Sequence, residues 1–205
     1  MKVKTLEASA INDIGHAFGY YDYGEETGLF SVFSSQEAVA TYIRGYVHGM
    51  LAGGLLYTNS QQGEGYIAYQ LPGQKIGLKV GLPLLKGLFQ AMRLKEVIRF
   101  CKVIKQGGPG LKERLDKKKQ PYVFVGLVCV REAYQGQGHM RQVMELAFAE
   151  GQRLGVPVIL ETDARSKCDK YLHLGMELAG TRDLGAYGTL YDLIKYPNQE
   201  GERHE

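Results

Sequence analysis

The sequence predicts an α/β fold, and residues 122–149 with the strand after them carry most of that prediction. Residues 122–130 are rich in Val, Phe, Leu and Tyr, which is typical of a buried strand. Gly155 and Pro157 end the helix that follows, and residues 158–160 are again apolar. Strand, helix and strand in this order predict two parallel strands joined by a right-handed crossover. The helix shows an apolar face at spacings i, i+3, i+4 and i+7, formed by Met140, Val143, Met144 and Ala147.

The loop between this strand and this helix predicts a phosphate site, because a helix start leaves unpaired N–H groups at the positive end of its dipole. A P-loop requires Gly-Lys-Ser/Thr, but Gly138 is followed by His139. A dinucleotide fingerprint requires a third small residue where Arg141 stands, and only about 65 residues follow the loop. Glu161, at the end of the next strand, still fits the dinucleotide interpretation.

The loop resembles that of the GCN5-related N-acetyltransferases. Their motif is Val, four residues, Arg or Gln, two residues, Gly, one residue, and Gly or Ala. Val130, Gln135 and Gly138 match this spacing, and Gly136 adds a glycine that often follows the Arg or Gln. Met140 stands where Gly or Ala is usual, and Glu132 stands where many members carry proline. We expect the Met140 side chain to point into the core, because it begins the apolar helix face.

A second segment, residues 166–176, resembles the closing helix of the same family, in which a Tyr lies four residues before a Gly and an apolar residue. Tyr171, Gly175 and Met176 occupy these positions. Ser166 and Asp169 have the spacing of an N-cap box for this helix. Residues 160–162 match a strand end that is common in the family, and 188–195 resemble its terminal strand.

The resemblance implies one acetyltransferase domain over residues 1–205, with a mixed central β-sheet and helices on both faces. It implies acetyl transfer from acetyl-CoA to a primary amine, carried by a small molecule or a peptide. The pantetheine arm would pair with the strand edge at Val128, Cys129 and Val130, and an N–H of the same strand would stabilise the oxyanion. The pyrophosphate would bind backbone N–H groups of Gln135, Gly136, Gln137, Gly138, His139 and Met140.

The resemblance also implies catalytic roles. Tyr171 would be the general acid that protonates the CoA thiolate, although one of 14 tyrosines could equally be an interfacial residue. Glu161 is the candidate general base, acting through water, and its alternative is a solvated acid at a strand end. Asp163 is interpreted as a loop residue. A candidate wall of the acceptor site, with core packing as its alternative, is formed by Phe18, Tyr20, Tyr21 and Tyr23.

Composition favours a cytoplasmic enzyme. Of the 205 residues 44% are hydrophobic, enough for a substantial core. Three Cys without a Cys-x-x-Cys motif predict neither disulfides nor a metal site, and they favour a reducing compartment. We also expect no membrane-spanning segment, because no apolar run reaches the required length.

Residues 82–119 form a basic helical insertion that the family does not predict. Pro83 is placed to start a helix, and 81–120 hold 11 Lys and Arg against 3 Asp and Glu. The insertion could pack on the sheet with a solvated basic face, attract CoA or an acidic acceptor, or contact an anionic surface. No aromatic residues alternate with its lysines, so we expect no nucleic-acid partner. Its apolar residues recur at helical spacing: Leu84, Leu85, Leu88, Phe89, Met92, Val97, Cys101 and Ile104.

Two questions stay open at this level. The apolar faces of the first helices and of the insertion suit either a homodimer or the core. An acyl-CoA-binding regulatory module without turnover would keep the same loop as the enzyme.

Overall fold

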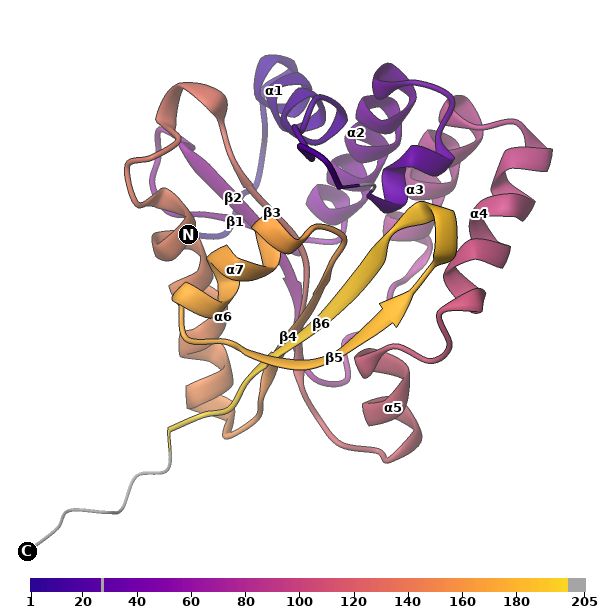
Figure 1. The fold of residues 1–205 in the computed structure, drawn as a ribbon. Helices are drawn as coiled ribbons and strands as arrows, with labels where there is room; N and C mark the ends of the chain where they lie inside the picture. The colour runs from indigo at the N-terminus through magenta and orange to yellow at the C-terminus, as the bar shows by residue number, and fades with distance from the viewer. Residues whose placement is uncertain (27, 199–205) are drawn as a thin grey trace, which may run out of the picture.

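The computed structural model of this protein describes residues 1–26 and 28–198. Within these residues six strands form one sheet in the order β1-β2-β3-β4-β6-β5 (Figure 1). As the sequence predicts, β3 and β4 pair in parallel, whereas the other neighbouring strands are antiparallel. The sheet is therefore mixed. The strands are β1 Leu56–Thr58, β2 Gly65–Gln70, β3 Val123–Val130, β4 Val158–Thr162, β5 Glu177–Asp183 and β6 Thr189–Lys195.

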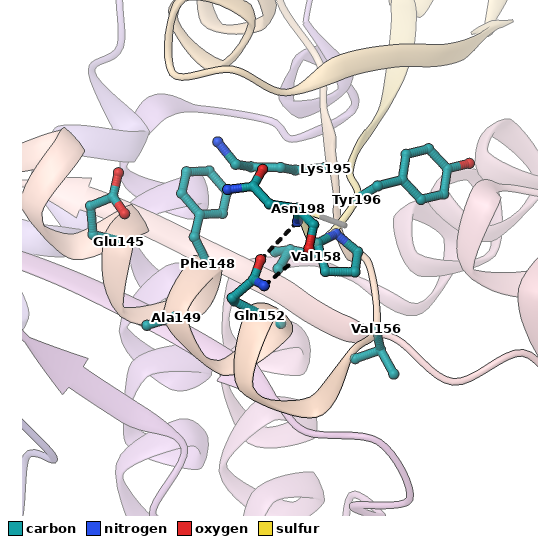
Figure 2. A pocket seen from close by; sticks show the side chains of 11 residues that line it. Glu145, Phe148, Ala149, Gln152, Val156, Val158, Lys195, Tyr196 and Asn198 are labelled. Atoms are coloured by element: carbon teal, nitrogen blue, oxygen red, sulfur yellow. Dashed lines mark hydrogen bonds between the residues drawn. The ribbon is translucent and has the colours of Figure 1, made fainter. Parts of the chain in front are cut away.

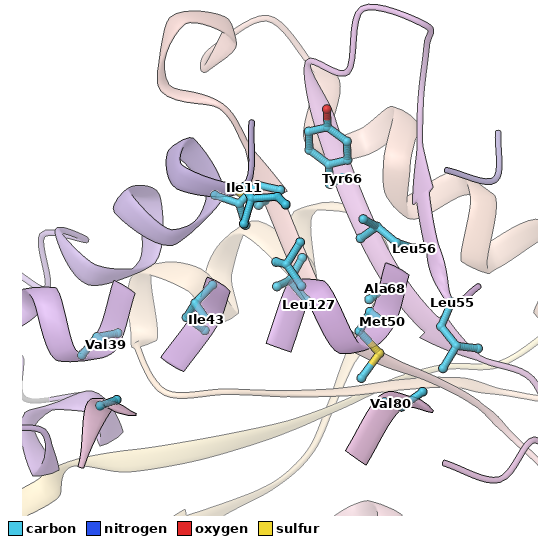
Figure 3. Close-up of a cluster of buried hydrophobic side chains, with 14 of the residues drawn as sticks. Ile11, Val39, Ile43, Met50, Leu55, Leu56, Tyr66, Ala68, Val80 and Leu127 are labelled. Atoms are coloured by element: carbon cyan, nitrogen blue, oxygen red, sulfur yellow. The ribbon is translucent and has the colours of Figure 1, made fainter. Parts of the chain in front are cut away.

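Helices cover both faces of the sheet, which confirms the predicted fold class. On one face α6 and α7 bury Ile67, Val123 and Val125. On the other face α1 and α2 bury Leu56, Ala68 and Leu127, as Figure 3 shows. The helices are α1 Ala8–Gly19, α2 Gln36–Ala52, α3 Leu78–Ala91, α4 Leu94–Gln106, α5 Leu111–Lys117, α6 His139–Leu154 and α7 Arg165–His173. Among the described residues no helix has the length and apolar composition needed to cross a membrane.

Strand β3 contains a β-bulge at Gly126. Ala68 pairs with Leu127 and Tyr69 with Val125, so Gly126 is an extra residue without a partner on β2. Gly126 and Leu127 therefore face the same side of the sheet. A Cβ at Gly126 would lie 2.1 Å from the hydroxyl oxygen of Tyr46 on α2. Glycine at the bulge thus allows Tyr46 to approach the strand.

The strands β3 and β4 separate at this bulge. Their parallel pairing extends from Val123 with Val158 to Val125 with Leu160 and goes no further. The remainder of β3 keeps its antiparallel partner β2 as far as Val130. From Leu127 onwards, the side of β3 that faces β4 has no strand partner among the described residues.

The basic insertion folds as three helices, and its boundaries differ from the sequence prediction. Helix α3 begins at Leu78, so Pro83 lies inside it and removes one hydrogen bond of its second turn. The apolar repeat is interrupted at Met92, and α4 begins after Arg93, whose N–H donates to Glu96 Oε2 at 2.7 Å. Lys117, Lys118 and Lys119 precede β3, whereas the glycine loop follows it. The eight-residue strand β3, about 26 Å long, thus lies between these lysines and the loop.

Candidate functional site

The loop before α6 presents a run of free backbone donors. Among the described residues the N–H groups of 136–140 donate to no protein acceptor. Gly136 and Gly138 adopt left-handed backbone conformations, with φ of 75° and 82°. Nothing lies within 4 Å of a Cβ built on either residue, so the backbone conformation and not crowding requires glycine. Five donors at the positive end of a helix dipole suit a phosphate group.

Two contacts from distant segments hold this loop. The side-chain amide of Asn59, in the turn after β1, donates to His139 Nδ1 and to Gln142 Oε1, both at 2.9 Å. At the other end of the loop, Arg131 forms a 2.8 Å ion pair with Asp13 of α1. Neither Asn59 nor Arg131 stands out in the sequence, because each acts through a partner at least 80 residues away.

The side chains of the other predicted loop residues contact backbone carbonyls of the loop or the core. The side chain of Gln135 donates to the carbonyl of Val130 at 3.4 Å, and that of Gln137 donates to the carbonyl of Ala133 at 3.3 Å. Gln135 N–H donates to the Glu132 carbonyl, so it is not part of the free run. Met140 packs against the core between α6 and the sheet, so its side chain does not fill the loop.

The edge of β3 offers further backbone groups. Arg131 N–H donates to the Glu64 carbonyl, which continues the pairing with β2. Because peptide groups alternate along a strand, those of Cys129 face β2, whereas those of Val128 and Val130 face the separated β4. Burial raises the pKa of the Cys129 thiol to about 12, so it stays protonated and unreactive at neutral pH. Of the three residues predicted for this edge, Val128 therefore offers both its N–H and its carbonyl on that side, whereas Val130 offers its N–H, because its carbonyl accepts from Gln135.

Tyr171 lies on α7, packed against the core shared by α6 and the sheet. Burial raises the pKa of its hydroxyl, and the neighbouring Asp163 carboxylate, Tyr21 and Cys129 raise it further. The hydroxyl is therefore protonated at neutral pH, which is the state that a general acid requires.

The segment before η1 (Leu29–Val32) is attached to the start of α7. Tyr23 donates to Asp163 Oδ2 at 2.8 Å, and Lys167 binds Asp163 Oδ1 at 2.9 Å. The Lys167 ammonium also lies 4.1 Å from the centre of the Tyr21 ring, and Tyr21 hydrogen-bonds to Ser166 at 2.9 Å. Asp163 is thus a buried anchor and not merely a loop residue. The cap prediction for Ser166 is wrong, because Ala164 precedes the helix.

The predicted aromatic wall is divided by the fold. Tyr21 and Tyr23 lie against α7, whereas Phe18 packs edge-on to Phe30 in the core, with ring centres 6.4 Å apart. Tyr20 is exposed and stacks on His16.

Glu161 belongs to a charged cluster on the face of the sheet opposite to α6 and α7. Its Oε2 lies 2.8 Å from Arg182 Nη2, and the same guanidinium group binds Asp192 Oδ1 at 3.0 Å. Asp192 is fully buried, and Arg114 of α5 approaches its other oxygen at 3.1 Å. Burial raises the pKa of Glu161, and Arg182 opposes that rise. Glu161 is therefore not a freely solvated acid at a strand end.

Among the described residues no group of three or more His, Cys, Asp and Glu could hold a metal ion. A hollow of about 270 Å³ lies elsewhere, between the end of α6 and the end of β6 (Figure 2). Gln152 and Asn198 form two hydrogen bonds across it. It lies about 20 Å along α6 from the glycine loop, given 1.5 Å per helical residue, and is not part of the site.

No protein-family model and no curated protein matches this sequence. Solved structures do match. An N-acetyltransferase from Staphylococcus aureus Mu50 is 14% identical, with a TM-score of 0.55 over 95% of this chain and 100% of that one. Arylalkylamine N-acetyltransferase 2 from Aedes aegypti is 10% identical, with a TM-score of 0.54 over 95% and 97%.

A protein described as a histone acetyltransferase and related acetyltransferase, from Corynebacterium glutamicum, is 14% identical, with a TM-score of 0.55 over 97% and 98%. At such identities the similarity is one of fold. The sheet order, the separated parallel strands and these three structures together show that the chain has the fold of the GCN5-related N-acetyltransferases.

Proposed function

We propose that this protein is an N-acetyltransferase that moves the acetyl group of acetyl-CoA to a primary amine. The run of free N–H groups at 136–140 supports this most directly. The site combines these N–H groups, at the start of α6, with an edge of β3 that no strand of the described residues covers. CoA fits both features, because it carries a pyrophosphate and an amide-containing arm. A nucleotide without such an arm would use only the first feature.

In this proposal each part of the cofactor has its own partner. The pyrophosphate binds the N–H groups of 136–140, and the pantetheine amides pair with the peptide groups of Val128 and with the N–H of Val130. This leads the thioester along β3 towards Gly126, where the strands separate and Tyr46 approaches from α2.

The reaction then requires one bond exchange and two proton transfers. The amine nitrogen attacks the thioester carbonyl carbon, so a C–N bond forms while the C–S bond breaks. The N–H of Val128 stabilises the negative oxygen that develops. Tyr171 gives its proton to the departing thiolate, and the proton of the attacking amine passes through water to Glu161.

The first test concerns the loop. Replacing Gly138 with Ala puts a side chain on a residue whose φ is 82°, which costs about 1–2 kcal/mol in the left-handed conformation. We expect the loop to rearrange and the affinity for acetyl-CoA, measured by calorimetry, to fall about tenfold.

Gly155→Ala is a matched control, because Gly155 ends the same helix with a φ of 64° and no atom within 4 Å of a built Cβ. It should lower stability without changing the affinity. NADH and ATP serve as ligand controls. Equal binding of NADH would support the dinucleotide interpretation and contradict the proposed cofactor.

A second test concerns the base. Because burial raises the pKa of Glu161, it loses its proton at a higher pH than an ordinary glutamate. We therefore expect kcat/KM to fall on the acid side below that raised pKa, where Glu161 is protonated, and Glu161→Gln to remove this limb. A variant that keeps both the rate and the acid limb would exclude Glu161 as the base.

The non-catalytic alternative gives a different result. A regulatory module would bind acetyl-CoA at the same loop, yet an amine screen would release no free CoA above the rate of hydrolysis.

A further inference from the structure

Helices α3 and α4 present large apolar side chains to solvent. Leu78, Leu82, Leu85 and Phe89 follow one another at four-, three- and four-residue steps, so they form a single stripe along α3. Leu94 and Ile98 begin a second stripe on α4, and Ile76 lies just before α3. These seven side chains are between 48% and 80% exposed. We call these residues, with the lysines and arginines of 75–105, the α3–α4 surface.

The stripe faces outwards because α3 packs on α2 through small residues. A Cβ on Gly45 of α2 would lie 2.6 Å from the Cα of Gly87, and a Cβ on Gly49 would lie 2.6 Å from the carbonyl of Val80. The two backbones thus approach closely, and at these contact points there is no room for a large side chain. The sequence left open whether the apolar residues of the insertion belong to the core, and the structure places Leu85 and Phe89 among the exposed ones.

The charge of this surface is strongly positive. Residues 75–105 contain eight Lys and Arg and one Glu, whereas the whole chain has a net charge of +3. No ion pair among the described residues involves any of these eight cations. The single acid, Glu96, accepts a hydrogen bond from the N–H of Arg93. The surface therefore combines exposed apolar area with cations that have no counter-charge.

We propose that the α3–α4 surface binds an anionic phospholipid membrane. A lipid interface accepts both features, because acyl chains receive the apolar stripe while headgroup phosphates receive the lysines. A second copy of this chain fits less well, since symmetric contact would bring two sets of unpaired cations together. Nucleic acid would satisfy the charges but would leave the leucines without an apolar partner.

The position of the surface is compatible with activity. In Figure 1, α4 lies at the edge of the molecule beyond α2 and α3, on the side away from α6 and α7. A membrane bound there leaves the glycine loop before α6 accessible. The proposal does not depend on the proposed acetyl transfer.

The test is co-sedimentation of the full chain with vesicles of phosphatidylglycerol and phosphatidylcholine in equal amounts. We expect binding that weakens as salt is added, and little binding to phosphatidylcholine alone. The double variant Leu82→Gln/Phe89→Gln should reduce binding by at least about tenfold, because both side chains leave water on binding. Lys79→Gln/Lys86→Gln should reduce it on the order of tenfold and lessen the effect of salt.

Matched controls come from outside the surface. Leu178→Gln changes an exposed leucine on β5, and Lys4→Gln changes an exposed lysine near the N-terminus; neither should alter binding. All substituted side chains are exposed, so circular dichroism and the thermal midpoint should match the unaltered protein.

Three outcomes would overturn the proposal. Equal binding to neutral and anionic vesicles would contradict the role of the lysines. A dimer that Leu82→Gln/Phe89→Gln dissociates, without vesicle binding, would assign the surface to a second copy. A gel shift with RNA that needs Lys79 and Lys86, without vesicle binding, would assign it to nucleic acid.

Discussion

Replacing Tyr171 with Phe is expected to lower kcat by at least about 100-fold while the affinity for acetyl-CoA stays unchanged. The substitution removes only a hydroxyl, which in the proposed mechanism gives its proton to the departing thiolate. The ring stays packed against the core of α6 and the sheet, so the cofactor site keeps its shape. Steady-state kinetics with an accepted amine and calorimetry with acetyl-CoA measure the two quantities separately.

Tyr196→Phe provides a matched control, because Tyr196 is exposed beyond the end of β6. The pH profile adds a second measurement. Since the pKa of Tyr171 is raised, its hydroxyl stays protonated beyond the pH at which an ordinary tyrosine ionises. The kcat of the wild type should therefore not fall near pH 10 through ionisation of this residue. An unchanged kcat in Tyr171→Phe would show that Tyr171 is an interfacial residue and not the acid.

The second large effect concerns stability. Replacing Arg182 with Met is expected to lower the free energy of unfolding by about 3–5 kcal/mol, because it leaves a buried carboxylate without its main partner. Asp192 is fully buried and Glu161 only partly exposed, and both bind the Arg182 guanidinium. Arg114 remains near Asp192 at 3.1 Å but is itself partly exposed. Urea denaturation at neutral pH measures the change.

Two further variants show whether the loss of stability comes from the buried cluster or would follow from breaking any ion pair. Arg153→Met breaks an exposed pair with Glu150 and should cost at most about 1 kcal/mol. Arg182→Met/Asp192→Leu removes both buried charges and should regain part of the loss. If Arg182→Met costs no more than Arg153→Met, the cluster does not stabilise the fold as its burial suggests.

The secondary structure around the candidate site could largely be predicted, because it depends on residues that are close together in the chain. A strand, a glycine loop and a helix follow one another within residues 122–149, and their propensities act locally. Gly136 and Gly138 are visible in the sequence because a left-handed backbone favours glycine wherever it occurs. The parallel pairing of β3 with β4 follows from the helix between them, and the order Tyr171, Gly175, Met176 marks the closing helix.

Contacts between distant segments could not be predicted. Asp163 looks like a loop residue until Tyr23, 140 positions earlier, is placed against it. Glu161 looks solvated until β5 and β6 bring Arg182 and Asp192 beside it. The sequence pattern of a strand does not indicate which strands pair with it. In addition, the extra residue at Gly126 reverses which side chains of β3 lie on which face of the sheet.

The sequence by itself determined the kind of fold, the glycine loop before α6 and the position of the tyrosine on the closing helix, because each is a short-range pattern. Only the tertiary structure decided the separation of β3 from β4 after Val125 and the pairing of Glu161 with Arg182. It also decided that Leu78, Leu82 and Leu85 of α3 face outwards. An apolar repeat tells which residues share a helix face, but the close approach of Gly45 and Gly87 decides which face is buried.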